Sequence, residues 1–426
     1  MIGTKRLVYI LVAIIITTAN VYAKSVSMIV VENHSKIESC NSATIGSIIK
    51  TAGYYKSGDE GDAEYNVIAD EKIFKVDGNY IIKLRNGLLA KMNVKDGYIN
   101  IKTFGCKTQE EDKRFDNTKL FQTVVDIATS QSYAVFVPVG DFVLNGTIFL
   151  PTATKILGYH GYTFRKSSRL VQTVQSSYDE DSNVMFKGVN GDVLRHIVVE
   201  GVTFLRDRTK AERAIYNNGE GYGLKSTVFG SSTELSVTNC GFIGWGHCYD
   251  NAAILFSIRT DYAYCDNILY SKTGNSSSVV IQDANIWCCG HLIRLNHYAC
   301  SSIIFNNCWM EGLQTLLLAE NSARIENLGF SGCTISPLSF GAGHFLIQYP
   351  KKPSWNIVQV SFSQCVVNVP GNISTDLSPM AYRVNFSDCS VHYYGEGEKI
   401  TIEGNSVFWE GYTDRKSNKI VTKNNN

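Results

Sequence analysis

Three acidic residues, Asp266, Asp283 and Glu311, lie in a part of the chain where one short pattern recurs. A pair of carboxyl groups is the usual means of hydrolysing a glycosidic bond, because one protonates the leaving oxygen and the other activates water or attacks the sugar. A lyase would instead set a base beside the acidic carbon of the sugar and use a cation, such as Ca²⁺, to neutralise the substrate carboxylate. Trp309 is a candidate substrate-binding residue, because its ring could stack on a sugar. The three acids are candidate catalytic residues, provided that the fold brings them to one surface.

The recurring pattern is an apolar or aromatic residue followed three places later by cysteine. The seven matches are Val237/Cys240, Tyr262/Cys265, Ile286/Cys289, Phe305/Cys308, Phe330/Cys333, Phe362/Cys365 and Phe386/Cys389. Successive cysteines are separated by 25, 24, 19, 25, 32 and 24 residues. A period in the twenties with one short strand motif per repeat is typical of a solenoid, in which equivalent strands stack about 4.8 Å apart. We predict an all-β chain folded as a right-handed single-stranded parallel β-helix, with loop insertions around residues 206–232 and 341–354.

This alignment predicts which side chains face outward. Asp266 and Trp309 each follow a cysteine directly, and Glu311 lies two places beyond Trp309. Because side chains alternate along a strand, Asp266 and Glu311 would lie on one outer face, two coils or about 10 Å apart. Side-chain reach would bring their carboxyl groups toward the ~6.5–9.5 Å of an inverting pair, with Gly290 leaving room between them. Asp283 would lie on the neighbouring strand. The alternative is that these are ordinary surface acids beside an exposed tryptophan.

Two other polar residues of this region have structural alternatives. Asp250 follows the glycine-containing segment 244–247 and could simply finish a turn. His291 falls on an inward position of the alignment, which predicts a buried histidine rather than a catalytic one.

The cysteines raise the question of disulfides, since the chain has 12 of them. Stacked side chains on parallel strands point the same way about 4.8 Å apart, whereas a disulfide needs convergent Cβ atoms about 3.5–4.5 Å apart. We therefore predict that the seven repeated cysteines are buried free thiols that act as small apolar fillers. No metal site is expected, because the chain has no CxxC pair. Five cysteines lie outside the repeat and could pair with one another: Cys40, Cys106, Cys248, Cys288 and Cys300.

The composition excludes several classes of protein. Charged residues make up 19% of the 426 residues and the net charge is +1, so the chain lacks the basic excess of a nucleic-acid-binding protein. A hydrophobic content of 44% is ample for a folded chain. Lys5 and Arg6 precede an apolar run at residues 7–16, and Ala23 precedes a predicted cut, which indicates a signal peptide over residues 1–23. The alternative is an uncleaved membrane anchor. After cleavage we expect no membrane association, and a secreted or periplasmic location.

The mature chain divides into three predicted regions. Residues 24–100 form a small β-rich lead-in, residues 101–410 the β-helix domain, and residues 411–426 a flexible tail. A helix is expected to begin at Asp116 or Asn117, either of which can accept a bond from an orphan backbone amide. Apolar residues from Leu120 to Ala128 recur at helical spacing. This N-terminal capping helix would cover the open end of the strand stack, whose edge would otherwise pair with other chains.

Several segments resemble a known group of proteins. Residues 51–55 and 58–65, with the turns at 77–78 and 86–90, look like the segment before the β-helix in many phage tailspikes, and residues 100–106 resemble the opening strand of that group. Residues 116–118 and 137–142 are similar to the helix start and the proline–glycine turn of the pectate-lyase-like superfamily, although a charged stretch replaces the usual glycine-rich turn. The resemblance implies a β-helix and an acidic or complex polysaccharide as substrate. It carries over no catalytic residues, because these motifs are architectural.

These observations favour an exported carbohydrate-active protein that cleaves a polysaccharide as a hydrolase or a lyase. A non-catalytic carbohydrate-binding or surface-structural β-helix is the alternative, and a protein that handles the cell's own polysaccharide is a third. A hydrolase would need no cofactor, whereas a lyase could use Ca²⁺. A monomer and a tailspike-like homotrimer both remain open.

Overall fold

The computed structural model describes residues 27–159, 167–173, 184–206, 226–271, 276–295, 300–319, 325–337, 347–348, 357–369, 375–376, 381–393, 399–404, 407–413 and 419–424. The chain divides into two compact units, a lead-in unit of Met1–Asp96 with Lys102–Gly105 and a β-helix unit of Gly97–Ile101 with Cys106–Asn426. The predicted signal peptide at residues 1–23 lies outside the described residues. Of the loop insertion predicted at 341–354, only residues 347–348 are described. No helix in the described ranges is long and apolar enough to cross a membrane.

The lead-in unit is built on a five-stranded sheet in the order β1-β2-β3-β5-β4. Its strands are β1 (Met28–Val31), β2 (Ile48–Thr51), β3 (Glu64–Ile68), β4 (Ile81–Lys83) and β5 (Leu89–Met92), with the short 3-10 helices η1 (His34–Ser39) and η2 (Ile101–Phe104). β1 and β2 are parallel and the other pairs are antiparallel. The Asp59 carboxylate accepts bonds from the backbone N–H groups of Tyr54, Tyr55, Lys56 and Gly61, which closes the turn before β3.

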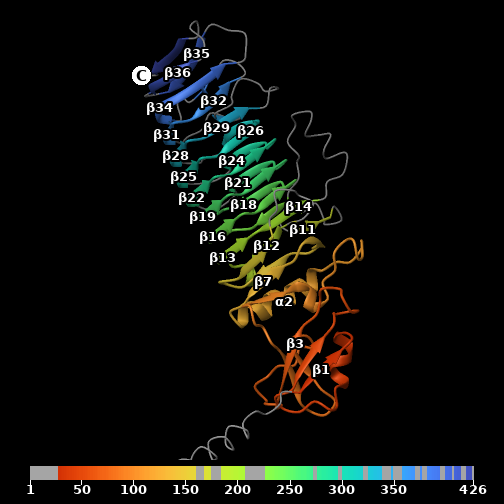
Figure 1. The fold of residues 1–426 in the computed structure, drawn as a ribbon. Coiled ribbons are helices and arrows are strands. Elements are labelled where there is room, and N and C mark those ends of the chain that lie inside the picture. The colour runs from red at the N-terminus through yellow and green to blue at the C-terminus, as the bar shows by residue number, and fades with distance from the viewer. Residues whose placement is uncertain are drawn as a thin grey trace, which may run out of the picture. The chain divides into compact units, whose positions relative to one another are not determined.

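The β-helix unit consists of coils with three short strands each, joined in parallel to the equivalent strands of the next coil (Figure 1). The first face contains β7 (Ala134–Val137), β10 (Lys155–Gly158), β13 (Leu194–Glu200), β16 (Ser232–Thr238), β19 (Ile254–Ile258), β22 (Ser276–Gln282), β25 (Cys300–Asn306), β28 (Ile325–Ser331) and β31 (Ile357–Ser363). β6 (Tyr98–Asn100) pairs with β7 ahead of them.

The second face contains β8 (Gly140–Val143), β11 (Ser168–Gln172), β14 (Val202–Arg206), β17 (Gly241–Ile243), β20 (Asp261–Ala263), β23 (Asn285–Trp287), β26 (Trp309–Leu313), β29 (Thr334–Pro337) and β32 (Val366–Val369). The third face is an eight-stranded sheet of β9 (Ile148–Leu150), β12 (Val184–Gly188), β15 (Thr227–Phe229), β18 (His247–Asp250), β21 (Asn267–Ser271), β24 (His291–Leu295), β27 (Thr315–Ala319) and β30 (Ile347–Gln348). A separate three-stranded sheet contains β33 (Thr375–Asp376), β35 (Lys399–Gly404) and β37 (Lys419–Asn424). The long strands β34 (Ala381–Tyr393) and β36 (Val407–Thr413) continue the first two faces. β37, which the sequence did not suggest, falls within the predicted tail and pairs in parallel with β35.

The first and second faces meet at a corner formed by one left-handed residue per coil, which we call the first corner. Its residues are Gly201, Asn239, Arg259, Asp283, Asn307, Gly332, Gln364 and Asp388, with φ between 51° and 70°. Left-handed φ values turn the chain sharply, and glycine, asparagine and aspartate adopt them most readily. A second corner, between the second and third faces, contains Gly244, Tyr264, Cys288 and Gly312 in the same conformation.

The seven repeated cysteines line the interior, but in two columns rather than one. Cys240, Cys308, Cys333, Cys365 and Cys389 follow the first corner, where Thr260 and Ala284 take the same place in the intervening coils, as the bonds from Asp261 N to Cys240 O and from Trp309 N to Ala284 O show. Cys265 and Cys289 lie at the second corner, at the position that Trp245 occupies one coil earlier than Cys265. The single ladder predicted from the sequence was therefore wrong in its register at two coils. Small side chains suit the tight interior of either corner, and cysteine alone does not distinguish them.

The prediction of free thiols is confirmed for the described cysteines. All seven repeated cysteines are buried and none forms a disulfide, and Cys40, Cys106, Cys248 and Cys288 are also free. Beside the first-corner thiols the rings of Phe305, Phe330, Phe362 and Phe386 stack with centroid separations of 5.3, 4.9 and 4.5 Å. The core of these coils is thus a set of parallel ladders of like residues.

The predicted helix is present as α2 (Thr118–Ser130). Asp116 provides its N-terminal bond, since the Thr118 N–H donates to Asp116 Oδ1 at 3.0 Å, while the Asn117 side chain bonds Lys107 instead. The buried face of the helix consists of Phe121, Val124, Val125 and Ala128. Gln122 exchanges two hydrogen bonds with the backbone of Phe149, which attaches α2 to the first coils.

Candidate functional site

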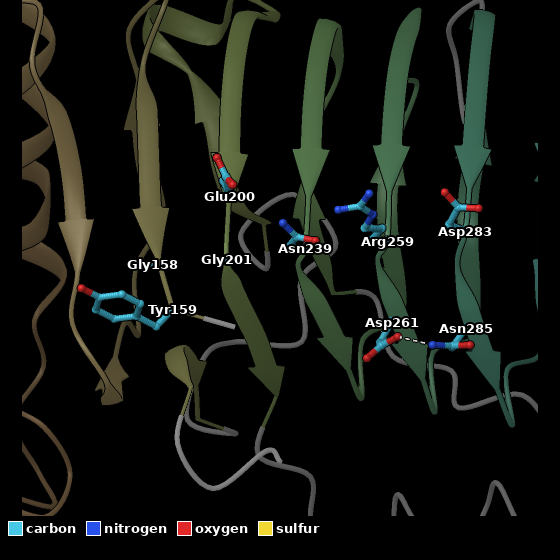
Figure 2. A pocket seen from close by; sticks show the side chains of 9 residues that line it. All are labelled: Gly158, Tyr159, Glu200, Gly201, Asn239, Arg259, Asp261, Asp283 and Asn285. Atoms are coloured by element: carbon cyan, nitrogen blue, oxygen red, sulfur yellow. Dashed lines mark hydrogen bonds between the residues drawn. The ribbon is translucent and has the colours of Figure 1, made fainter. Parts of the chain in front are cut away.

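A groove with a volume of about 460 Å³ runs along the first corner, across the coils from β10 to β23. We call it the corner groove; it is lined by Gly158, Tyr159, Glu200, Gly201, Asn239, Arg259, Asp261, Asp283 and Asn285 (Figure 2). Three carboxylates, one guanidinium, two amides and a phenol therefore converge on one concave surface. Such a polar lining can bind sugar hydroxyl groups and place an acid beside a glycosidic oxygen.

The regular stacking of coils explains why residues so far apart in sequence meet here. Gly201, Asn239, Arg259 and Asp283 occupy the left-handed position on four successive coils. Asp261 and Asn285 occupy a second row, two residues further along, because Asp261 pairs directly with Asn285 in β20 and β23.

Gly158 has to be a glycine for a packing reason. A Cβ atom at this position would lie 2.7 Å from Ser168 Cβ and 2.8 Å from the carbonyl oxygen of Gly201, both far inside normal contact. Tyr159 follows it with 60% of its surface exposed, at the end of the groove. An exposed tyrosine next to a glycine floor provides both an aromatic surface and a hydroxyl group for a sugar.

The charged groups of the groove differ in their partners. Asn285 Nδ2 donates a hydrogen bond of 2.9 Å to Asp261 Oδ1, and Gln282 Nε2 donates one of 3.1 Å to Asp283 Oδ2. Arg259 is exposed and forms no ion pair within 4.0 Å with any residue that the structure describes. Figure 2 shows the Arg259 side chain directed over the turn toward Asn239, between the coils that carry Glu200 and Asp283.

Asp261 and Asp283 have a separation that suits paired carboxylate chemistry. They lie on adjacent coils and two residues apart along the strand, which places their Cα atoms about 8 Å apart from strand geometry alone. Side chains on Cα atoms this far apart can reach the separation of about 6.5–9.5 Å between the carboxyl groups of inverting glycosidases, which leave room for a water molecule. Glu200 lies two coils from Asp261 and is too distant for such a pair, so its carboxylate is available only to bind substrate.

Of the residues predicted from the sequence, Asp283 alone lines the corner groove. Asp266 was predicted to face outward but is only 8% exposed, because it follows the second corner at the entry to β21. Glu311 is exposed on the second face, where it pairs with Trp287, which in turn pairs with Ala263 one coil earlier. The structure therefore does not bring Asp266 and Glu311 together. Gly290 also has another purpose, since a Cβ there would lie 2.6 Å from the Asp266 carbonyl oxygen.

Trp309 was aligned correctly on the outer face and lies next to the groove. It is 52% exposed and pairs directly with Asn285, so it continues the row of Asp261 and Asn285 by one coil. Its Nε1 donates a hydrogen bond of 3.4 Å to Glu311 Oε2, and Trp287 is 46% exposed on the neighbouring coil. Two indole rings thus flank the end of the groove.

Asp250 and His291 lie away from the groove, on the third face. Asp250 is the last residue of β18 and is half-buried. His291 is also half-buried, and burial, together with the nearby Arg294, lowers its pKa to about 4. A histidine that is neutral at ordinary pH fits the structural role predicted for it.

The arrangement of coils is shared with solved proteins. The tailspike protein of Acinetobacter phage vB_ApiP_P1 matches over 92% of this chain and 70% of its own, with a TM-score of 0.56 at 15% identity. The enzymatically active domain of tailspike protein 2 of bacteriophage CBA120 matches over 92% and 60%, with a TM-score of 0.57 at 12% identity. The chain has the parallel β-helix fold of phage tailspikes. A tailspike of Acinetobacter baumannii bacteriophage Fri1, described as a capsular polysaccharide depolymerase, matches over 92% and 76%, with a TM-score of 0.52 at 11% identity.

The resemblance to tailspikes predicted from the lead-in motifs is thus confirmed at the level of the fold. The chain spans only 60% of the second of these tailspike chains. No protein-family profile and no curated protein matches the sequence. The chemistry of this tailspike-like β-helix is therefore inferred from the residues of the corner groove and not from a relative.

Sequence reasoning missed Asp261, Arg259 and Glu200. Asp261 was lost through the misplaced register at Cys265, which put Asp266 in its row. A signal was present: in four of the five correctly aligned coils, the residue before the first-corner cysteine is Asn239, Asn307, Gly332 or Asp388, all suited to a left-handed turn, and Gln364 is the exception. Tyr264 and Cys288, which precede Cys265 and Cys289, do not fit this pattern. Within the described ranges, no cluster of three or more His, Cys, Asp or Glu side chains could hold a metal ion.

Proposed function

We propose that this chain is an exported protein that cleaves a complex or acidic polysaccharide in the corner groove. The observation that carries the proposal is the row of Asp261, Asn285 and Trp309 beside Asp283, which combines two aspartates on adjacent coils, with Cα atoms about 8 Å apart by strand geometry, with an aromatic sugar platform. The enzymatically active and depolymerase tailspikes that share the fold support a polysaccharide as substrate. Export is supported by the N-terminal residues 1–23, whose composition is that of a signal peptide.

The favoured reaction is hydrolysis with inversion. One carboxylic acid protonates the glycosidic oxygen as the bond to the anomeric carbon breaks, and the other carboxylate takes a proton from the water that attacks from the opposite side. Asp261 is assigned the role of the base, because the hydrogen bond from Asn285 fixes the orientation of its carboxyl group. Asp283 at the first corner is then the acid.

A lyase is the second candidate, and Arg259 is the observation that favours it. Elimination from a uronic acid requires a cation near the substrate carboxylate, and Arg259 is the cation of the groove lining. An absorbance signal from an unsaturated uronate product would select the lyase, whereas new reducing ends without that signal would select the hydrolase.

The decisive experiment compares two aspartates of the same corner. Asp283→Asn and Asp388→Asn replace left-handed aspartates by a residue equally suited to that backbone, but only Asp283 lines the groove. We expect Asp283→Asn and Asp261→Asn each to reduce cleavage of a susceptible polysaccharide at least about a hundredfold, the usual value of a general acid or base, while Asp388→Asn retains it. Unchanged cleavage in both groove variants would reject this site. Binding without cleavage by the native protein, across a panel of bacterial and plant polysaccharides, would favour a non-catalytic carbohydrate-binding protein.

Two structural expectations accompany this proposal. We propose that the coils wind right-handed, as parallel crossover connections almost always do, and that α2 covers the end of the stack through Phe121 and its buried neighbours. Replacing Phe121 by aspartate should then expose the strand edge and cause self-association, which light scattering would detect. The same measurement on the native chain would distinguish a monomer from a homotrimer.

A further inference from the structure

Arg259 occupies an unusual position for its residue type. It has φ of 52° at the first corner, where six of the eight residues are glycine, asparagine or aspartate; Gln364 is the other exception. A long side chain with a Cβ is disfavoured in the left-handed region, at a cost that glycine or asparagine largely avoids. Strained residues of this kind persist where they have a task, so the observed outlier calls for a functional explanation.

The position gives no structural task to the Arg259 side chain. It is exposed, and it pairs with none of the acids of the groove in the described structure, although Asp283 lies on the adjacent coil at the same corner position. Its backbone N–H bonds the carbonyl oxygen of Gln282 at 2.9 Å, an interaction that any residue could make. The guanidinium is therefore available to a ligand in the groove.

The neighbouring acids do not prevent an anionic ligand from binding there. The acids nearest to Arg259 are Asp283, one coil away at the same corner position, and Asp261, two positions further along the strand, so both lie within a Debye length of about 8 Å and their repulsion of an anionic ligand is only partly screened. Contact of a carboxylate with a guanidinium is short-ranged and bidentate, with two parallel N–H···O bonds, so it is far less affected. Asn239 and Asn285 on either side supply neutral donors and acceptors for sugar hydroxyl groups.

We infer that Arg259 binds the carboxylate of an acidic sugar and makes the corner groove selective for uronate-containing polysaccharide over its neutral counterpart. The inference rests on the proposed function of the groove and adds the substrate class and the specificity-determining residue. It concerns recognition, so it holds for a hydrolase and for a lyase alike.

The test uses one variant that removes the charge while relaxing the backbone. Arg259→Asn places a residue suited to the left-handed conformation, so its melting temperature should be equal to or above that of the native chain, and any loss of binding cannot be ascribed to unfolding. Gln364→Asn is the matched control, with the same backbone change at the same corner outside the groove. The probes are polygalacturonate, alginate and hyaluronate, each beside a form whose carboxylates have been chemically reduced to alcohols. Binding is measured by affinity electrophoresis.

We expect at least one carboxylated polymer to bind the native chain and Gln364→Asn about tenfold to a hundredfold more tightly than its reduced form, as for a hydrogen-bonded charge. In Arg259→Asn this difference should disappear, while the reduced polymer binds unchanged. If no carboxylated polymer is preferred over its reduced form, or if the preference survives in Arg259→Asn, the inference is wrong.

The proposed function can survive that failure. In one such outcome, neutral polymers bind equally to the native chain and to Arg259→Asn, and Asp283→Asn no longer cleaves them. The groove would then still be the active site, and only its selectivity for acidic sugars would be rejected.

Discussion

Asn285 Nδ2 donates a hydrogen bond of 2.9 Å to Asp261 Oδ1 across two adjacent coils (Figure 2). The two residues are directly paired in β20 and β23, so the bond is a consequence of register. A hydrogen bond to one carboxylate oxygen restricts the rotation of the carboxyl group. Asn285 is therefore a positioning residue for Asp261.

Removing this amide should impair turnover more than binding. We expect Asn285→Ala to lower kcat about tenfold with a smaller change in KM, because a hydrogen bond to a charged group contributes about 1.5 kcal/mol or more. Steady-state kinetics on a susceptible polysaccharide would measure the split. Thr334→Ala, further along the same row and outside the groove, is the control. An equal loss in Thr334→Ala would indicate a general structural effect instead.

Trp309 should contribute to the binding of long substrates. It lies one coil beyond Asn285, so an oligosaccharide must extend past the carboxylates to reach it. Trp309→Ala should weaken binding of long oligosaccharides about three- to tenfold, the usual value of an aromatic stacking contact, and leave short ones unaffected. Calorimetric titration against a ladder of chain lengths would show this. Phe256→Ala removes a similarly exposed ring on β19, outside the groove, and should change neither.

His291 should make the fold sensitive to mild acid. Burial lowers its pKa to about 4 in the folded chain, against an ordinary value of about 6.5 in the unfolded chain. Between these values the unfolded chain binds the extra proton, so stability is complete above about pH 6.5 and falls by up to roughly 3 kcal/mol as the pH drops to about 4. Thermal melts from pH 7 to pH 4 should show this slope, and His291→Asn should flatten it. An unchanged slope in the variant would assign the acid sensitivity to other groups.

The interior thiols of Cys240 and Cys333 should be reduced and unreactive in the native protein. Burial raises the pKa of Cys240 to about 12, and the adjacent Cys308 thiol together with burial raises that of Cys333 to about 12. At pH 8 only about one in ten thousand such groups is a thiolate, the reactive form. A thiol reagent should label these cysteines only after denaturation, and the intact mass should show no hydrogens lost to disulfides between them. Rapid labelling under native conditions would contradict the closed interior.

The sequence was sufficient for the fold because a β-helix is built from local repetition. Apolar residues and cysteines at intervals in the twenties required a solenoid, and the geometry of parallel strands correctly excluded disulfides along the ladder. The helix at residues 118–130 was also predictable, although its N-terminal bond comes from Asp116 and its buried face includes Phe121 rather than Leu120.

The candidate site was recovered only in part, and for a physical reason. Thr260 and Ala284 fill the first corner as well as cysteine does, because the interior there requires small size and not sulfur. Aligning the coils on cysteine therefore shifted two of them to the second corner, which moved Asp266 into the row that belongs to Asp261. Trp309 kept its outer position because it follows Cys308, which was aligned correctly, whereas Asp283 lies in one of the shifted coils but had been assigned to a neighbouring strand rather than through its cysteine.

The sequence by itself determined that this chain coils, that its cysteines are interior fillers, and that acids and a tryptophan lie on its outside. Only the tertiary structure decided which of them meet, because a contact between coils depends on the number of residues in every turn between them. Those turn lengths are set by the left-handed corners and their packing. The groove of Asp261, Arg259 and Asp283 exists because two adjacent coils place Arg259 and Asp283 at the same corner position, with Asp261 two residues further along its strand.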